Sequence, residues 1–171
     1  SYYRALQSET VTSHSLRRQT AQLACSLISA ALQNESVFLS VDDTTVPKFG
    51  KKFDAVSLLH DHACHTGKPY VNGHCFVSLT LSVPVLNQHE GKAPLIRYLA
   101  VPVGYRMWTK EQTKLELAGD LIEEVMPLLK DRQVLLLFDS WYAKSSLIER
   151  VLQYPGLDII CNVRSDSAMY E

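Results

Sequence analysis

Three aspartates follow two short apolar runs of the sequence. Asp42 and Asp43 come after residues 37–41, and Asp139 comes after residues 134–138. Unbroken apolar runs rich in valine, leucine and phenylalanine are typical of strands that are buried on both faces of a sheet. If the two strands are parallel neighbours, the acids project from one edge of the sheet, where sites form in open α/β folds.

Carboxylates in such a position are suited to divalent metal ions. Mg²⁺ and Mn²⁺ prefer carboxylate oxygens and keep several waters for substrate phosphates. Two such ions held ~3.5–4 Å apart can clamp the attacking and the leaving oxygen of a phosphodiester. We therefore expect Asp42, Asp43 and Asp139 to serve as metal ligands for phosphoryl transfer or hydrolysis on nucleic acid. The alternative is that they cap turns at strand ends.

Basic and aromatic side chains near the strand ends extend this hypothesis to DNA binding. The candidate contacts to a phosphate backbone are Lys48, Lys51, Lys52, Arg106, Lys110 and Lys144. Trp141 and Tyr142 could stack on an unpaired base near a cleavage point, or pack against the following helix. The basic residues could equally be solvated surface side chains. The formal net charge of −1 argues against a non-specific polyanion binder.

A histidine-rich segment offers a second kind of metal chemistry. It reads H-D-H-A-C-H over residues 60–65 and is followed by His74 and Cys75. Imidazole and thiol groups are typical zinc ligands, but this spacing matches no standard zinc module. We expect these side chains to pack, cap turns or line the site, with a structural zinc ion as the alternative.

The first half of the chain predicts one helix and three strands. Apolar residues at near-helical intervals predict an amphipathic helix over residues 15–32, before the strand at 37–41. A loop then runs from residue 47 to about residue 72. Two strands over residues 75–85 and 95–108, joined by a turn-rich link, predict an antiparallel hairpin.

The second half alternates helices with strands. Capping boxes at Thr109 with Gln112 and at Ser146 with Glu149 predict helices before and after the strand that ends at Asp139. A final strand is expected over residues 157–163. Three antiparallel strands are thus followed by parallel strands joined by right-handed helical crossovers. This order predicts an α/β fold, with a mixed sheet and helices on its faces.

Length and composition are those of one globular domain. The 171 residues are 46% hydrophobic and 20% charged, which is sufficient for a single core. No apolar run approaches the ~20 residues of a membrane span, and the first residues lack a secretory pattern. The four cysteines are scattered without C-x-x-C spacing. We therefore expect reduced thiols, no membrane partner and a cytoplasmic location.

Four segments of the chain, taken in order, resemble blocks of a known family. D-D-T-T-V-P-K-F-G-K-K (42–52) and F-D-S-W-Y-A-K (138–144) are similar to two catalytic blocks, the first typically D-x-T-x-x-x-K-x-G-K. Y-V-N-G-H-C-F-V-S-L (70–79) and V-P-V-G-Y-R-M-W-T-K (101–110) are similar to the strands between them. The family is that of bacterial insertion-sequence transposases of the DDE superfamily, and the resemblance covers about residues 36–170.

The resemblance implies an RNase H-like catalytic core over residues 36–171, preceded by an N-terminal helical segment over residues 1–35. It implies DNA transposition, in which a metal-activated water cleaves at the element's ends and the freed 3′-hydroxyl attacks target DNA. The implied cofactor is Mg²⁺ or Mn²⁺. The implied partners are double-stranded DNA, at transposon ends and at the target, and a second copy in a homodimer of the full-length protein.

Carried over by position, Asp42 is the first metal ligand and Asp139 the second. The pattern D-x-T also fits a register that begins at Asp43, but Asp42 places Lys48 and Gly50 in the family's register. The third acid of the family is a glutamate on a helix well after the fifth strand, and Glu171 follows the last strand too closely to be that residue. We therefore expect a C-terminally truncated core that cannot cleave DNA efficiently alone.

Two other functions are compatible with the same residues. The chain could be another RNase H-like nuclease, such as a resolvase or an RNA-cleaving hydrolase. It could also be a non-catalytic DNA-binding or assembly module derived from a transposase, in which case Asp42 and Asp139 would bind no metal.

Overall fold

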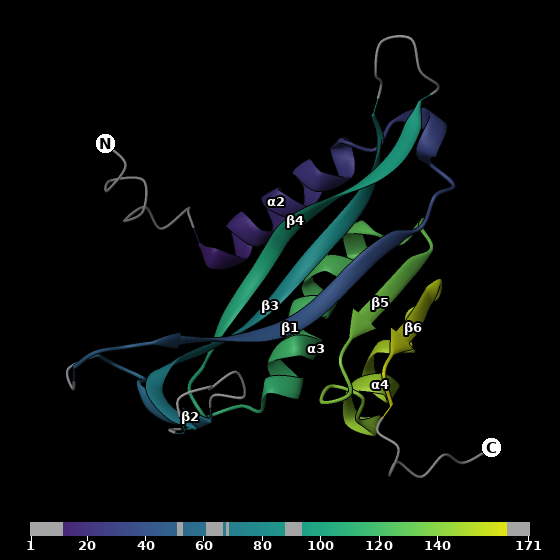
Figure 1. Ribbon diagram of the computed structural model, residues 1–171. Coiled ribbons are helices and arrows are strands. Elements are labelled where there is room, and N and C mark those ends of the chain that lie inside the picture. The colour runs from purple at the N-terminus through teal and green to yellow at the C-terminus, as the bar shows by residue number, and fades with distance from the viewer. Residues whose placement is uncertain (1–11, 51–52, 61–66, 68, 88–93, 164–171) are drawn as a thin grey trace, which may run out of the picture.

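The computed structural model of the chain describes residues 12–50, 53–60, 67, 69–87 and 94–163. The helices are α2 (Ser13–Ser26), α3 (Lys114–Val125) and α4 (Ser145–Val151), with single 3-10 turns at Ala30–Leu32 and Met126–Leu128. The strands are β1 (Val37–Pro47), β2 (Ser57–His60), β3 (Tyr70–Asn87), β4 (Leu95–Trp108), β5 (Val134–Phe138) and β6 (Leu157–Cys161). They form one twisted sheet (Figure 1).

The sheet changes from antiparallel to parallel pairing at β1. One edge of β1 pairs antiparallel with β3, and its other edge pairs parallel with β5. Beyond β5 lies β6, also parallel, whereas β2 and β4 pair antiparallel with β3. The predicted mixed α/β sheet is confirmed, because β1, β3 and β4 form the antiparallel part and helices lead into the parallel strands.

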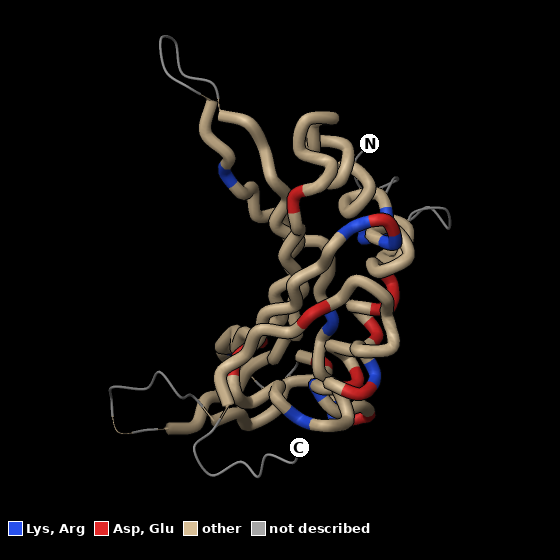
Figure 2. The backbone as a smooth tube through the Cα atoms, turned by 90° about the vertical axis from the view of Figure 1, so that its right-hand side faces the viewer, with Lys and Arg blue, Asp and Glu red and all other residues tan. Residues whose placement is uncertain are grey.

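All three described helices pack against the same face of this sheet, as the two views in Figures 1 and 2 show. That face carries Val37, Leu39 and Val41 of β1, which are buried, whereas the intervening Phe38 and Ser40 are partly exposed. Burial therefore alternates along the strand with a period of two, as expected when one face is covered. Apolar helix residues complete a single core with this face.

Contacts at two glycines show how closely the helices and the sheet approach. A Cβ atom on Gly104 of β4 would lie 2.7 Å from the Leu121 side chain of α3 and 3.1 Å from the Arg17 side chain of α2. On α3, the Arg150 side chain of α4 lies directly over Gly119. The absence of a Cβ at both positions allows the three helices to form one layer.

The predicted N-terminal helix belongs to this core. Its buried residues Ala21 and Ala24 pack in the same cluster as the strand residues. The helix ends at Ser26 instead of continuing to Leu32, because the chain turns there and resumes as a short 3-10 turn. Within the described residues, no helix is long and apolar enough to cross a membrane.

The first strand is longer than its apolar run. It continues to Pro47, so Asp42 and Asp43 lie inside the strand and not after it. The reason is that β3 pairs with β1 from Phe38 through Pro47, whereas β5 pairs with it only as far as Ser40. The short strand β2 was not predicted, and it lies in the segment interpreted as a loop.

Both predicted helix caps were wrong by position. Helix α3 begins one turn later, with Thr113 as N-cap: its hydroxyl accepts from the Glu116 N–H at 3.1 Å, and the Glu116 carboxylate accepts from the Thr113 N–H at 2.6 Å. Helix α4 begins at Ser145 after Lys144, with no side-chain cap. Capping sequences recur by chance, and the real cap depends on where the preceding strand ends.

Candidate active site

The register of two neighbouring strands brings Asp42 and Asp139 together. The parallel pairing of β1 with β5 aligns Ser40 with Leu137. Continued for two residues, this register would place Asp42 beside Asp139, which is the first residue after β5. Residues opposite one another in a sheet point to the same face, and both aspartates line one groove of about 860 Å³. The predicted convergence of these two acids at one sheet edge is therefore consistent with the observed register.

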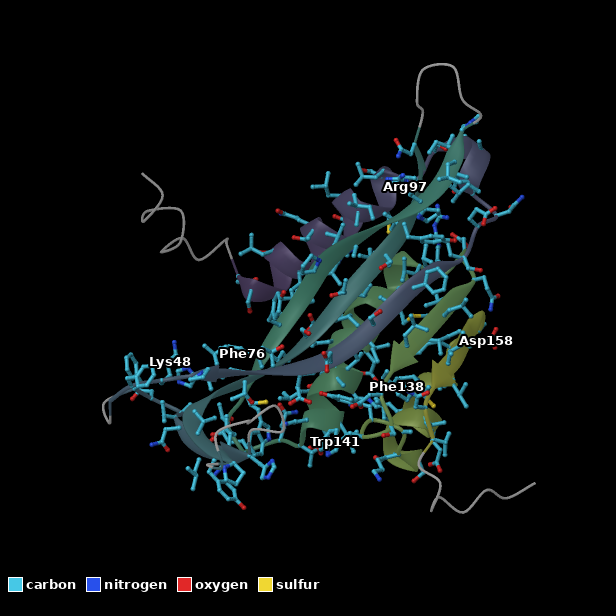
Figure 3. The ribbon with its side chains drawn as sticks, viewed as in Figure 1. Lys48, Phe76, Arg97, Phe138, Trp141 and Asp158 are labelled. Atoms are coloured by element: carbon cyan, nitrogen blue, oxygen red, sulfur yellow. The ribbon has the colours of Figure 1, made fainter. Side chains whose placement is uncertain are left out.

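The groove forms because β1 continues where β5 ends. Phe138 is the last residue of β5, and the chain turns there into α4, as Figure 3 shows beside Trp141. The uncovered second half of β1 forms one wall. The lining residues include, besides the three aspartates, Thr44, Thr45, Leu58, Leu59, His60, Trp108, Thr113, Lys114 and Trp141.

The Asp139 carboxylate is held by the turn that follows it. Its Oδ1 accepts hydrogen bonds from the backbone N–H groups of Trp141 at 3.0 Å and Tyr142 at 3.4 Å. This is the turn-capping role that aspartate often has after a strand. It uses one oxygen, and no described residue donates to Oδ2, so the turn orients the carboxylate without occupying it.

The Asp42 carboxylate is held in a similar way. Its Oδ1 accepts from the backbone N–H of Asp43 at 2.8 Å, and its side chain is exposed. No described residue donates to its other oxygen. Asp42 and Asp139 therefore both line the groove, and each has one carboxylate oxygen to which no described residue donates.

Asp43 is different, because described side chains engage both of its oxygens. Oδ2 accepts from Lys114 Nζ at 2.6 Å and from the Cys75 thiol at 3.4 Å, and Oδ1 accepts from the Tyr142 hydroxyl at 3.3 Å. The alternation of β1 turns Asp43 toward the helices and Asp42 away from them. Of the two registers left open by D-x-T, this geometry favours Asp42 as the ligand.

The charges around Asp43 have clear consequences for its partners. Burial lowers the pKa of Lys114, but the hydrogen bond and negative charge of Asp43 outweigh it, and the net pKa is raised. Burial, and then the nearby Asp43 charge, raise the pKa of Tyr142 well above its usual value, so its hydroxyl keeps its proton. Burial also raises the pKa of the Cys75 thiol.

Lys114 is a site residue that the sequence did not identify. It lies 71 positions from its partner Asp43, and no motif relates the two. Its ammonium also lies between two indole rings, 5.6 Å from the Trp108 centroid and 5.3 Å from the Trp141 centroid. Such cation–π contacts are attractive by about 0.5–1 kcal/mol at exposed sites, so Lys114 links both tryptophans to the groove.

The two aromatic residues after Asp139 have different environments. Tyr142 is 1% exposed and packs in the core, as the packing alternative expected, so its ring presents no face to a base. Trp141 is 46% exposed and lines the groove. Of these two residues, Trp141 is the one accessible for stacking on a nucleotide.

The predicted DNA-binding cations are dispersed. Lys110 and Lys144 are exposed, and Lys48 lies far along the extension of β1, well separated from Phe138 and Trp141 (Figure 3). Lys51 and Lys52 lie outside the described residues. Dispersed exposed lysines can contact a phosphate backbone only over an extended surface.

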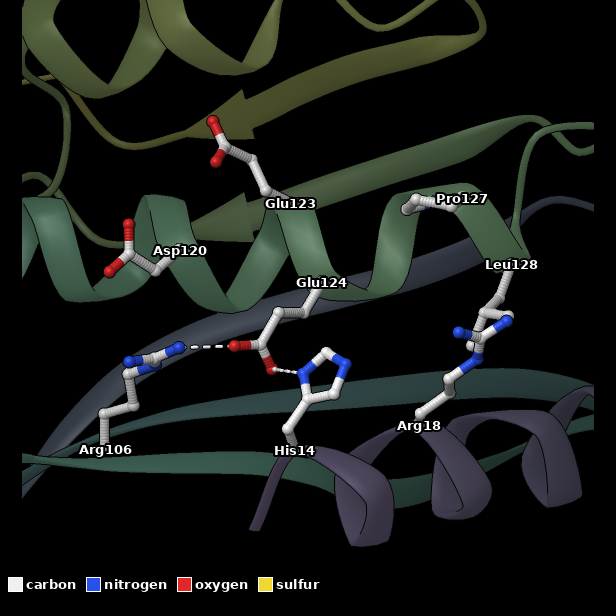
Figure 4. A pocket seen from close by; sticks show the side chains of 8 residues that line it. All are labelled: His14, Arg18, Arg106, Asp120, Glu123, Glu124, Pro127 and Leu128. Carbon is white, nitrogen blue, oxygen red and sulfur yellow. Dashed lines mark hydrogen bonds and ion pairs between the residues drawn. The ribbon is translucent and has the colours of Figure 1, made fainter. Parts of the chain in front are cut away.

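Arg106 faces a second hollow instead of the groove. This hollow, of about 510 Å³, lies between α2 and α3, where Arg106 and His14 both contact Glu124 (Figure 4). Arg17 also donates to Glu124, at 2.7 and 3.0 Å. Arg106 is thus part of an ion-pair network that joins α2, β4 and α3.

The histidine-rich segment lies mostly outside the described residues. Of its members, His60 lines the groove and His74 contacts the Asp54 carbonyl oxygen at 2.8 Å. The Cys75 thiol donates a hydrogen bond to the Asp43 carboxylate. In the described part of the chain, no three or more His, Cys, Asp and Glu side chains converge as metal ligands. The alternative of a structural zinc ion thus gains no support from these residues.

The donor set of the groove fits a hard divalent cation as a partial site. Asp42 and Asp139 offer two carboxylate oxygens from neighbouring strands, and Mg²⁺ is often held by one or two carboxylates with waters and substrate phosphates as the other ligands. Asp43 does not fit this role as well, because Lys114 already neutralises it.

A mixed sheet with this strand order and with helices on one face is consistent with an RNase H-like fold. The family comparison agrees: residues 1–171 match the model described as DDE superfamily endonuclease. The chain belongs to this superfamily, whose members act on DNA and generally use divalent metal ions. Comparison with curated proteins and with solved structures gave no match.

Proposed function

We propose that the chain is the catalytic domain of an insertion-sequence transposase in which Asp42 and Asp139 bind Mg²⁺ or Mn²⁺. The observation that supports this most directly is that Asp42 and Asp139, which follow the paired parts of the neighbouring strands β1 and β5, line the same groove. Such a domain would hydrolyse phosphodiesters at transposon ends and transfer the freed strand to target DNA, acting as a homodimer on double-stranded DNA.

The chain's own residues would bind the metal and the DNA. A divalent ion supplies Lewis-acid activation of water and charge neutralisation at the phosphate. Asp42 and Asp139 would hold it through their outward oxygens, each oriented by a backbone N–H. Trp141 would stack on a nucleotide at the groove, and Lys110 and Lys144 would contact the phosphate backbone. Efficient cleavage would need a third acidic ligand, which the described residues do not supply.

Mn²⁺ binding tests the proposal. Titration of the wild-type chain with Mn²⁺, followed by calorimetry and by paramagnetic broadening of backbone amide signals, should show one site with broadening centred on β1 and the turn after β5. Asp42→Asn and Asp139→Asn should each weaken binding by at least about tenfold, because each removes a charged ligand oxygen.

Asp131→Asn is the matched control, because Asp131 is an exposed aspartate in the turn before β5 and does not line the groove. It removes the same charge and should leave Mn²⁺ affinity unchanged. Equal affinity in wild type, D42N and D139N would contradict the proposal. It would favour the non-catalytic module, for which DNA affinity should also be insensitive to these substitutions.

A further inference from the structure

One carboxylate joins three elements around the groove. Asp43 extends from β1 to Lys114 at the start of α3 and to Tyr142 in the turn between β5 and α4. With side-chain exposures of 25% for Asp43 and 21% for Lys114, the pair is largely shielded from water. Charge-assisted hydrogen bonds of this kind are shorter and stronger than neutral ones, so they hold the carboxylate in one orientation.

Tyr142 hydrogen-bonds to two of the three aspartates that line the groove, Asp43 and Asp139. Its hydroxyl donates to Asp43, while its backbone N–H donates to the Asp139 carboxylate at 3.4 Å and to the Asp139 carbonyl at 3.2 Å. Because the ring is buried, its orientation fixes the position of its backbone. The hydroxyl bond therefore fastens the turn that carries Asp139 to β1.

The backbone of Asp43 has a matching role for Asp42. Its N–H donates to Asp42 Oδ1 at 2.8 Å. One residue thus holds Asp42 through its N–H group and holds the Asp139 turn through its side chain. The separation and orientation of the two outward carboxylates both depend on Asp43.

We propose that Asp43 and Tyr142 are positioning residues that set the geometry of Asp42 and Asp139, and that Asp43 is not itself a metal ligand. The inference rests on the proposed function, since it takes Asp42 and Asp139 as the metal-binding pair. Lys114 completes the arrangement by compensating the Asp43 charge. Removing a residue that hydrogen-bonds to a metal ligand commonly weakens metal affinity by about 10–100-fold.

Tyr142→Phe is the most direct test, because it removes one hydroxyl and changes no charge and no proposed ligand. We expect Mn²⁺ affinity to fall about tenfold, with the fold retained as judged by near-UV circular dichroism. A ligand role for Asp43 gives the opposite result: removing the hydroxyl would free Oδ1, and affinity would be unchanged or tighter. Either of these outcomes would overturn the proposal.

Tyr154→Phe is the matched control. Tyr154 is a half-buried tyrosine just after α4, in contact with the core but remote from the groove lining. It should leave Mn²⁺ affinity unchanged. A loss as large as that of Y142F would show that removing any packed hydroxyl has this effect, and would also overturn the positioning role.

A measurement without metal separates this inference from the proposed function. The amide proton shifts of Trp141 and Tyr142 report their bonds to the Asp139 carboxylate. Y142F should move both signals, and Y154F should move neither. If the wild-type chain binds no Mn²⁺, the proposed function fails. The amide shifts still test whether Tyr142 positions the Asp139 turn, because unchanged Trp141 and Tyr142 signals in Y142F would refute that role.

Discussion

Asp43 and Lys114 neutralise one another at a partly buried position, so neither can be replaced alone without leaving an uncompensated group. Asp43→Asn should lower the free energy of unfolding by about 1–3 kcal/mol, the range for hydrogen bonds to charged groups. The double variant Asp43→Asn with Lys114→Met removes both charges and should recover part of this loss. Urea denaturation at neutral pH measures both values, with Asp131→Asn as the control that should change little.

A double variant that is no more stable than the single one would contradict this account. It would mean that Lys114 reaches water readily once Asp43 is replaced, as long lysine side chains can. The coupling energy from the double-mutant cycle, expected to be about 0.5–3 kcal/mol for residues in contact, gives the direct comparison.

At the level of single residues, the sequence identified the three aspartates but not the side chains that contact them. Strand-end spacing identified Asp42, Asp43 and Asp139, and the D-x-T pattern left two registers open. The distinction comes from strand alternation, which directs Asp43 toward the helices, where it pairs with Lys114, and turns Asp42 to the opposite face of β1. Lys114 is far from Asp43 in sequence and becomes its neighbour only because α3 packs across β3 and β4.

Among the elements, α2, α3 and β4 are joined through Glu124. Its carboxylate accepts hydrogen bonds from Arg17 on α2 and Arg106 on β4, and lies 3.5 Å from His14. Glu124→Gln keeps the shape but loses the charge. We expect it to lower the free energy of unfolding at pH 7 by about 1–3 kcal/mol, as measured by urea denaturation.

This contribution should depend on pH in a definite direction. Burial raises the pKa of Glu124, but the hydrogen bonds and charges of Arg17 and Arg106 outweigh it and the net pKa is lowered. The stabilisation is therefore present above the ordinary glutamate pKa of about 4.3 and is lost as pH falls through the lower pKa of the folded state. The difference between wild type and E124Q should shrink between pH 7 and pH 3. A constant difference would refute the ionic origin.

Elements defined by apolar runs were easier to predict than their ends. The strand predicted over residues 95–108 matches β4, and the run before Asp139 matches β5. By contrast, β2 has only four residues, and its pairing with β3 depends on contacts that no local pattern records. The helix caps were misplaced for a similar reason: Thr109 and Thr113 both precede α3 and only the packed structure selects Thr113, whereas α4 begins without a side-chain cap.

For the molecule as a whole, the two signs of charge are interspersed over the helical layer, as Figure 2 shows. DNA binding would then depend on a few exposed lysines, among them Lys110 and Lys144, and not on the net charge of −1. Each lysine that contacts a phosphate should add about 0.9 to the slope of log affinity against log salt.

Lys110→Ala and Lys144→Ala should each reduce that slope by about 0.9. Fluorescence anisotropy with a short DNA duplex between 50 and 200 mM salt, the range over which such slopes are resolved, measures the change. Lys130→Ala is the control, because Lys130 is an exposed lysine before β5, at the end opposite the groove. Equal slopes in all four proteins would exclude a phosphate contact by either lysine.

The overall architecture could be predicted because strand order and connection length leave few topologies for such a chain. The groove could not be predicted from the sequence. It exists because β1 extends past β5, and this depends on how far β3 follows β1, from Phe38 through Pro47. The side of the sheet that the described helices cover also depends on three-dimensional packing, at positions such as Gly104.

The contrast between the two adjacent aspartates has a consequence for how the protein can evolve. Under the proposed function, Asp42 and Asp139 supply the metal-binding oxygens, and replacing either residue would remove a ligand and with it the activity. Asp43, Lys114 and Tyr142 instead satisfy one another, and a neutral trio of similar volume would fill the same space. Among descendants of one ancestor, these three positions should therefore change together, whereas the outward pair should stay fixed for as long as selection maintains activity.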